Sequence, residues 1–308
     1  MSHLRTNLRF EDWRAASVHG EYNFSVFAPS DLPFANIVVN HSEDGVITAF
    51  GPAAFMTVTG SEELSLTTGR YGDIFVSDSY EIVVEVGYKG VVTFHDVEDA
   101  DVYLDAGAFA DIVGGYNVNV ESLAGKYGEG VTMAAQDVGG ELIASLTHNA
   151  PDTVMLDGIV SAEIDLGKGG DDVAHITPMA PGEGVLAGDL SRIILSGFGP
   201  DDLLFLHQPA GAMLMDVTTY GDTVGVLVRS MDEGGHIRTA LTEIVGPGSF
   251  QPDGKQLDLV GEVMDSRFGD TKVVDYMQKD DSYYFGGYLD YQESSAQSSW
   301  GDGGGSFA

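Results

Sequence analysis

The sequence contains no cysteine, which excludes disulfide bonds, zinc-thiolate sites and thiol catalysis. An extracellular protein without disulfides and a cytosolic protein both accommodate that absence. Basic residues are scarce, because 14 Lys and Arg stand against 48 Asp and Glu and give a formal net charge of -34. A field of this sign repels nucleic acid and anionic membrane surfaces. We therefore expect no nucleic-acid partner.

Long apolar runs are also absent. No stretch of about 18 apolar residues occurs, so we expect no membrane span. The N-terminal residues lack the basic, then apolar, then small-residue pattern of a cleaved secretory signal, so export would need another signal. Residues 251–308 are acidic and aromatic and end in a Ser/Gly/Gln-rich stretch. We expect this tail to be a secretion signal or a contact segment.

Helical periodicity is nearly absent, and the pattern that replaces it is typical of strands. The 41 glycines are spread through sequence in which apolar and polar residues alternate. Alternation is clear at 83–86, 117–120 and 162–166, and 153–156 is a short apolar run. β-Branched residues are common in these segments, which favours an all-β protein.

A repeated turn separates these strands. Six segments can be aligned on an opening residue at intervals of 18, 20, 18, 23 and 19 residues, and the fifth position is acidic in five of them. Their opening residues are Gly69 ("GRYGDIF"), Gly87 ("GYKGVVT"), Gly107 ("GAFADIV"), Gly125 ("GKYGEGV"), His148 ("HNAPDTV") and Gly167 ("GKGGDDV").

This period predicts a parallel β-solenoid, similar to a β-roll, with about 18 to 23 residues per rung. Each rung would be strand, turn, strand, turn, so that stacked rungs form two parallel sheets around a thin apolar core. The alternative is an antiparallel β-sandwich with evenly spaced hairpins. The solenoid interpretation divides the chain into an N-terminal cap (1–60), solenoid repeats (61–190), a C-terminal β cap (191–250) and the tail (251–308).

The acidic fifth positions are candidate metal ligands. Carboxylates one rung apart on a single edge would repel one another and favour a bound counterion. Ca²⁺ is the natural choice, because it takes about six to eight oxygen ligands from carboxylates and turn carbonyls. The candidate ligands are Asp73, Asp111, Glu129, Asp152 and Asp171.

The segment "GKGGDDV" resembles the GxGxDxU portion of the nonapeptide in repeats-in-toxin (RTX) proteins. The segment "RIILSGFGPDDLLFL", residues 192–206, is similar to the region that follows the repeats in many of them. The resemblance implies Ca²⁺ bound between successive turns. It also implies export of the unfolded chain by type I secretion through an uncleaved C-terminal signal. The remaining turns depart from the consensus, which indicates degenerate repeats.

Catalytic motifs are missing, since the sequence has no HExxH, GxSxG or phosphate-binding loop. We therefore expect no enzyme, but a secreted, calcium-stabilised structural or adhesive protein that forms or decorates a filament, matrix or surface layer. Its partners would be other copies or cell-surface and matrix components. Two alternatives remain: a polysaccharide lyase or epimerase, for which basic residues are few (Arg70, Lys89, Lys126 and Lys168 in the turns), and a virion structural protein.

Overall fold

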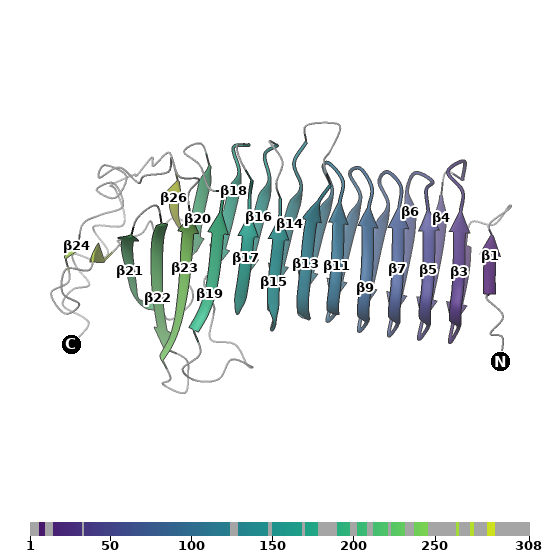
Figure 1. Ribbon diagram of the computed structural model, residues 1–308, viewed down its shortest axis with the longest axis horizontal. Helices are drawn as coiled ribbons and strands as arrows, with labels where there is room; N and C mark the ends of the chain where they lie inside the picture. Colours follow the sequence, from purple (N-terminus) through teal and green to yellow (C-terminus); the bar gives the residue numbers. More distant parts are fainter. Residues whose placement is uncertain are drawn as a thin grey trace. The chain divides into compact units, whose positions relative to one another are not determined.

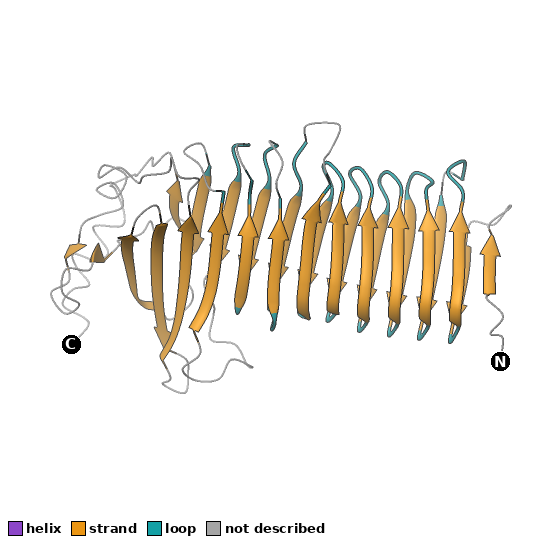
Figure 2. Cartoon of the chain, viewed as in Figure 1, coloured by secondary structure: helices purple, strands orange, loops and turns teal. Residues whose placement is uncertain are grey.

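The computed structural model is built from β-strands, and no helix occurs in the residues that it describes (Figure 2). These residues are 6–9, 15–32, 34–123, 129–146, 150–167, 170–177, 190–197, 202–207, 212–220, 223–231, 237–245, 263–264, 272–273 and 282–286. The chain divides into two compact units, Met1–His148 and Asn149–Ala308. The expected all-β parallel solenoid is confirmed. Within the described residues there is also no helix of the length and apolarity that a membrane crossing requires.

Unit 1 consists of two parallel sheets in which consecutive strands alternate (Figure 1). All of its strand pairs are parallel. The odd-numbered sheet contains β1 (Thr6–Arg9), β3 (Tyr22–Ala28), β5 (Glu43–Ala49), β7 (Glu62–Thr68), β9 (Tyr80–Val86), β11 (Glu98–Leu104), β13 (Tyr116–Ser122) and β15 (Glu141–Ser145). The even-numbered sheet contains β2 (Ala15–His19), β4 (Ala35–Asn40), β6 (Ala54–Thr59), β8 (Asp73–Ser77), β10 (Val91–His95), β12 (Phe109–Val113) and β14 (Thr132–Gln136).

Unit 2 begins with parallel pairs and ends with antiparallel ones. Strands β16, β18 and β20 pair in parallel, as do β17, β19 and β23, whereas the other pairs are antiparallel. The bounds are β16 (Thr153–Asp157), β17 (Ser161–Asp165), β18 (Val173–Thr177), β19 (Leu190–Ser196), β20 (Leu203–His207), β21 (Ala212–Tyr220), β22 (Thr223–Met231), β23 (Ile237–Val245), β24 (Val263–Met264), β25 (Lys272–Val273) and β26 (Ser282–Gly286).

The segments expected to cap the solenoid include some of its rungs. Residues 15–59, within the expected N-terminal cap, form strands β2 to β6 of the same parallel ladders. Strands β19 and β20, within the expected C-terminal cap, also pair in parallel. In the second cap, antiparallel pairs join β21 to β22 and β22 to β23. Two strands of this cap also pair antiparallel with strands of the tail, β20 with β26 and β21 with β25. Apart from β24, β25 and β26, the tail lies outside the described residues, as do Phe10 and Trp13 of the expected N-terminal cap.

The core of unit 1 follows from strand alternation. In β7, Leu64 and Leu66 are buried while Ser65 and Thr67 are only partly covered, and in β8 the side chains of Ile74 and Val76 are fully buried. Inward Val, Ile and Leu from both sheets therefore meet in one thin layer, as a period of two requires. This burial is the main source of stability.

The regular rung of unit 1 has 18 residues. Tyr80 pairs with Glu62 and with Glu98, and Val91 pairs with Asp73 and with Phe109, so each partner is 18 positions away. Glycine directly follows β7 and β9, as Gly69 and Gly87. A Cβ on Gly87 would lie 2.5 Å from the carbonyl oxygen of Gly69, and a Cβ on Gly69 would lie 2.4 Å from that of Phe50. Close stacking of these turns therefore requires glycine.

Buried serines connect the turns that precede the odd strands. The N–H of Ser42 donates to Oγ of Ser61 over 3.2 Å, and the N–H of Ser61 donates to Oγ of Ser79 over 3.1 Å. Each hydroxyl in turn donates to a carbonyl two residues earlier, for example Ser61 to Thr59. This serine ladder, formed by Ser42, Ser61 and Ser79, therefore satisfies backbone N–H donors that the strands leave unpaired.

Candidate cation-binding sites

An open groove of about 840 Å³ lies on the outer face of the odd-numbered sheet in unit 1, near the first residues of β5 to β15. Both apolar side chains and carboxylates and amides line it. No Lys, Arg or His lines it. The lining residues are Asp44, Gly45, Val46, Glu63, Leu64, Ser65, Glu81, Val83, Asp99, Ala100, Asp101, Asn117, Val118, Asn119, Glu141 and Ile143.

A repeated backbone conformation produces the acidic wall. The second residue of each of six consecutive odd strands has a left-handed φ between 51° and 54°. This conformation interrupts alternation at the start of the strand. The strand pairing then places these side chains one above another, about 4.8 Å apart. The residues are Asn23, Asp44, Glu63, Glu81, Asp99 and Asn117.

The row carries four adjacent carboxylates. Burial raises the pKa of Glu63, and the neighbouring charges of Glu81, Glu43, Glu62 and Asp44 raise it further. The hydrogen bond and the charge of Glu81 raise the pKa of Tyr80 to about 12. In both cases the neighbouring carboxylates add to the shift, because they favour the protonated form.

Amides end the acidic row. Nδ2 of Asn117 donates to Oδ1 of Asp99 over 2.9 Å, and Nδ2 of Asn119 donates to Oδ1 of Asp101 over 3.1 Å. Each amide therefore satisfies a carboxylate of the preceding rung without adding charge. This row was not predicted from the sequence. The recurrence of an acid at the second strand position, in "EDG", "EEL", "YEI" and "EDA", could have revealed it.

The expected row of turn carboxylates is not formed. Asp73 is the first residue of β8 and pairs with Val91, whereas Asp111 is the third residue of β12 and pairs with Thr93. The two acids therefore occupy different rows. The regular period of 18 leads from Gly87 to Asp105, not to the aligned Gly107. Burial raises the pKa of Asp73.

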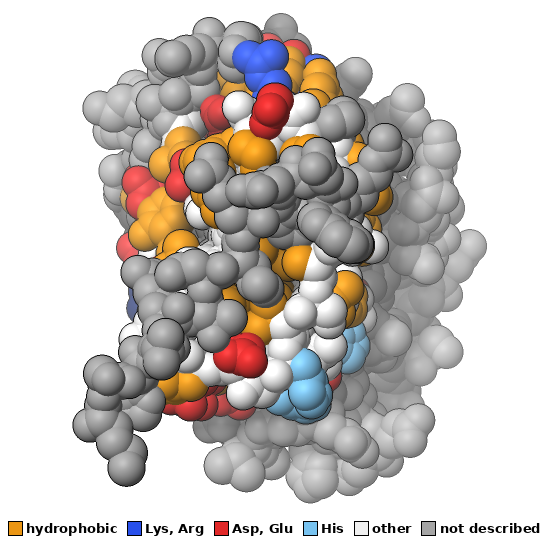
Figure 3. Space-filling model, turned by 90° about the vertical axis from the view of Figure 1, so that its right-hand side faces the viewer, with side chains coloured by type: hydrophobic (Ala, Val, Ile, Leu, Met, Phe, Trp, Pro, Cys, Tyr) orange, Lys and Arg blue, Asp and Glu red, His pale blue; other side chains and the backbone are white. Residues whose placement is uncertain are grey.

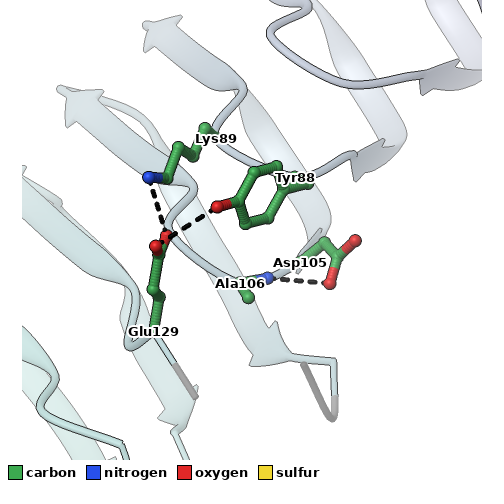
Figure 4. Close-up of polar contacts among 5 residues, drawn as sticks. All are labelled: Tyr88, Lys89, Asp105, Ala106 and Glu129. Atoms are coloured by element: carbon green, nitrogen blue, oxygen red, sulfur yellow. Dashed lines mark hydrogen bonds and ion pairs between the residues drawn. The ribbon is translucent and has the colours of Figure 1, made fainter. Parts of the chain in front are cut away.

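Glu129 is held by a lysine and a tyrosine (Figure 4). Its Oε2 lies 3.0 Å from Nζ of Lys89, and its Oε1 accepts a hydrogen bond from the Tyr88 hydroxyl over 3.2 Å. Arg70 and Lys89 both lie over the ring of Tyr88. The view in Figure 3 shows Lys or Arg beside hydrophobic side chains at the upper edge, where the turns after the odd strands lie. Glu129 thus belongs to a mixed cation and aromatic cluster.

The remaining two predicted ligands, Asp152 and Asp171, differ in burial. Asp152 is 1% exposed, whereas Asp171 is exposed and has a left-handed φ of 62°. Asp172, which follows Asp171, is 1% exposed. It lies beside Asp152 on the next rung, because the residues that follow them, Val173 and Thr153, pair with each other. Asp202 continues this row, since Val173 pairs with Leu203.

Asp172 and Asp202 were not among the ligands predicted from the sequence. The signal that could have found them is an aspartate directly before an apolar strand, in "PDT", "DDV" and "DDL". Burial raises the pKa of Asp172 to about 7, and the charges of Asp202, Asp152 and Asp171 act in the same direction. The hydrogen bond from the backbone of Asp152 opposes this shift but does not offset it.

Within the described residues, no group of three or more Asp, Glu or His side chains is arranged to hold a metal ion. A cation site in this part of the chain would therefore need backbone carbonyls in addition to carboxylates. The chain matches no protein-family model, no curated protein and no solved structure. The resemblance to RTX proteins consequently rests on the parallel β-solenoid and on the short turn motif.

Proposed function

We propose that this protein is a secreted structural or adhesive β-solenoid, stabilised by Ca²⁺, that forms or decorates an extracellular filament, matrix or surface layer. The observation that carries the proposal is the repetition of one outward-facing position over six rungs of unit 1, from Asn23 to Asn117. A rigid stack that presents like side chains at a fixed spacing suits contact with a repetitive partner, including other copies of the chain.

Charge supports the calcium part of the proposal. The net charge of -34 and the row of carboxylates from Asp44 to Asp99 destabilise the folded chain through mutual repulsion. Ca²⁺ is abundant outside cells and would reduce this repulsion. The likeness of "GKGGDDV" to an RTX turn supports type I export, because that route delivers an unfolded chain to a calcium-rich medium.

The enzyme alternative is less well supported. A lyase or epimerase acting on uronate polymers needs cationic side chains to hold the sugar carboxylates and to act as the base. The groove of unit 1 has none among its lining residues. We therefore propose contact, not catalysis, as the role of this surface.

Electron microscopy and analytical ultracentrifugation of the full chain test the assembly. We expect a chelator-treated sample to be monomeric or unfolded, and addition of CaCl₂ to produce ordered assemblies or binding to matrix material. A folded chain that stays monomeric in CaCl₂ and does not bind such material would refute the structural role. Unsaturated products after incubation with alginate or pectate would instead establish the lyase.

A further inference from the structure

Two of the few basic side chains of unit 1 lie together on one edge of the solenoid. Among its described residues, only Arg9, Arg70 and Lys89 are Lys or Arg. Arg70 and Lys89 are both exposed and lie in the turns after β7 and β9, on adjacent rungs. These two turns are joined by a hydrogen bond from the N–H of Tyr71 to the carbonyl of Tyr88. The edge therefore presents positive charge on a chain whose net charge is -34.

Two tyrosines accompany these cations. The rings of Tyr71 and Tyr88 lie 6.1 Å apart in an edge-to-face arrangement, and Tyr71 is 55% exposed. Cζ of Arg70 and Nζ of Lys89 lie 5.8 Å and 5.2 Å from the centroid of the Tyr88 ring. Tyrosine and arginine are among the side chains most enriched at the energetic centre of protein interfaces. We call Arg70, Tyr71, Tyr88 and Lys89 the cationic edge, and its composition suits a contact surface.

The ion pair with Glu129 leaves Lys89 available to this surface. The two side chains are 42% and 41% exposed (Figure 4). An ion pair that is so open to solvent contributes little to stability and is screened by salt. Lys89 can therefore exchange Glu129 for a carboxylate of a partner at little cost.

The groove on the odd-numbered sheet of unit 1 is complementary to the cationic edge. It contains the carboxylates of Glu63 and Glu81, on adjacent rungs, and no Lys, Arg or His lines it. Its lining residues Val46, Val83 and Ile143 are 42%, 39% and 40% exposed, so apolar surface is accessible to a tyrosine ring. Along the solenoid axis, successive rungs of both surfaces are about 4.8 Å apart. Two copies with aligned axes can thus bring successive cations to successive carboxylates.

We propose that the cationic edge of one copy of this protein binds the groove of a second copy, with Arg70 and Lys89 facing groove carboxylates such as Glu63 and Glu81. The proposal rests on the self-association proposed above and names the two surfaces that meet. Because edge and groove are different parts of unit 1, the contact is heterologous. It leaves an unused groove on one copy and an unused edge on the other, so repetition produces an open-ended assembly.

Neutralising the cationic edge tests this contact. Sedimentation velocity of the full chain, in CaCl₂ at low ionic strength, compares the wild type with Arg70→Gln/Lys89→Gln. The control Asn36→Asp/Asn40→Asp changes the net charge equally, at partly exposed positions of β4 in the even-numbered sheet. We expect the edge variant to need at least about a tenfold higher concentration to assemble, and the control to assemble like the wild type.

The outcomes of this comparison separate the two proposals. Equal assembly of the edge variant and the control would overturn the contact proposed here and leave self-association standing. A wild type that does not assemble at all would overturn both. If Arg70→Gln/Lys89→Gln does not fold, Arg70→Gln compared with Asn36→Asp makes the same test, because Arg70 is exposed and Glu129 then keeps Lys89.

A mixing experiment tests the groove as the partner of the edge. Glu63→Lys/Glu81→Lys reverses charge in the groove and keeps the native edge, whereas Arg70→Gln/Lys89→Gln keeps the native groove. Neither variant alone should assemble at the concentration at which the wild type does. Their equimolar mixture should form particles of two chains, because one native edge then meets one native groove. A mixture that stays monomeric, or that forms long assemblies, would overturn the inference.

Discussion

The backbone N–H of Asp152 donates to Oδ1 of Asp172 over 2.8 Å. The side chain of one buried aspartate therefore accepts a backbone hydrogen bond from the preceding rung. This relationship resembles the serine ladder of unit 1, where a hydroxyl takes the same role. The difference is charge. A hydroxyl satisfies the donor at no electrostatic cost, whereas a carboxylate brings a second oxygen that needs a proton or a cation.

The first prediction concerns pH in the absence of calcium. Because the pKa of Asp172 is raised to about 7 in the folded protein, the folded state retains a proton that the unfolded state has already released above about pH 4. Stability should therefore fall as pH rises from about 4 to about 7, by on the order of 2 kcal/mol between pH 5 and 8. Denaturant unfolding at several pH values, in the presence of a chelator, measures this change in the free energy of unfolding.

Asp172→Asn is the control for this pH dependence. The amide does not titrate, so its free energy of unfolding should change less between pH 5 and 8 than that of the wild type. An identical change in both proteins would show that other groups cause the effect.

The second prediction concerns the serine ladder. Ser61→Ala removes the acceptor of the Ser42 N–H and the donor to the Thr59 carbonyl. A buried N–H left without a partner costs about 1–3 kcal/mol, so the free energy of unfolding should fall by that amount. Ser65→Ala, on the outer face of β7, should change stability by less than about 0.5 kcal/mol. Equal effects of the two substitutions would contradict a role for the ladder.

The third prediction concerns the stacked glycines. Gly87→Ala places a Cβ 2.5 Å from the carbonyl oxygen of Gly69 and 2.8 Å from that of Thr68, and both atoms belong to the backbone. The rungs must then separate locally, which should cost about 1–3 kcal/mol. Gly139→Ala is the matched control, because the nearest atom to its Cβ is 3.6 Å away. Urea denaturation distinguishes the two, and equal stability of the variants would refute close stacking.

The fourth prediction concerns the acidic wall. Burial and the charges of Glu81, Glu43, Glu62 and Asp44 raise the pKa of Glu63, so its ionised form is disfavoured in the folded protein. Glu63→Gln should raise Tm at neutral pH in low salt, and the gain should shrink in 1 M NaCl as screening increases. Glu121→Gln, outside the groove, should have a smaller effect at both salt concentrations. A gain that does not depend on salt would argue against charge repulsion.

Local pattern was sufficient to predict the architecture. Alternation at 83–86, 117–120 and 162–166 predicted strands that the structure contains in β9, β13 and β17. The recurrence of Gly and Asp near every 20 residues predicted parallel rungs. These features are readable because side-chain direction in a strand and the conformational demands of a turn are properties of short segments.

The alignment of the acidic turns could not be predicted in the same way. An alignment on glycine puts Gly107 beside Gly87, but backbone pairing of Leu104 with Val86 puts Asp105 there. Pairing in the other sheet separates Asp73 from Asp111. Register depends on hydrogen bonds between rungs that lie 18 or more residues apart, and turn composition does not encode it. The acidic wall of unit 1 depends on the same pairing.

The sequence by itself therefore determined the strand content, the solenoid period and the excess of negative charge. Only the tertiary structure decided which of two adjacent aspartates is buried. Asp171 and Asp172 have the same chemistry, but the strand alternation that buries Ala174 also turns Asp172 inward, while a left-handed residue at position 171 leaves its side chain exposed. The physical reason is that burial belongs to the packed rung, so two identical side chains acquire different exposure to solvent only after the rungs stack.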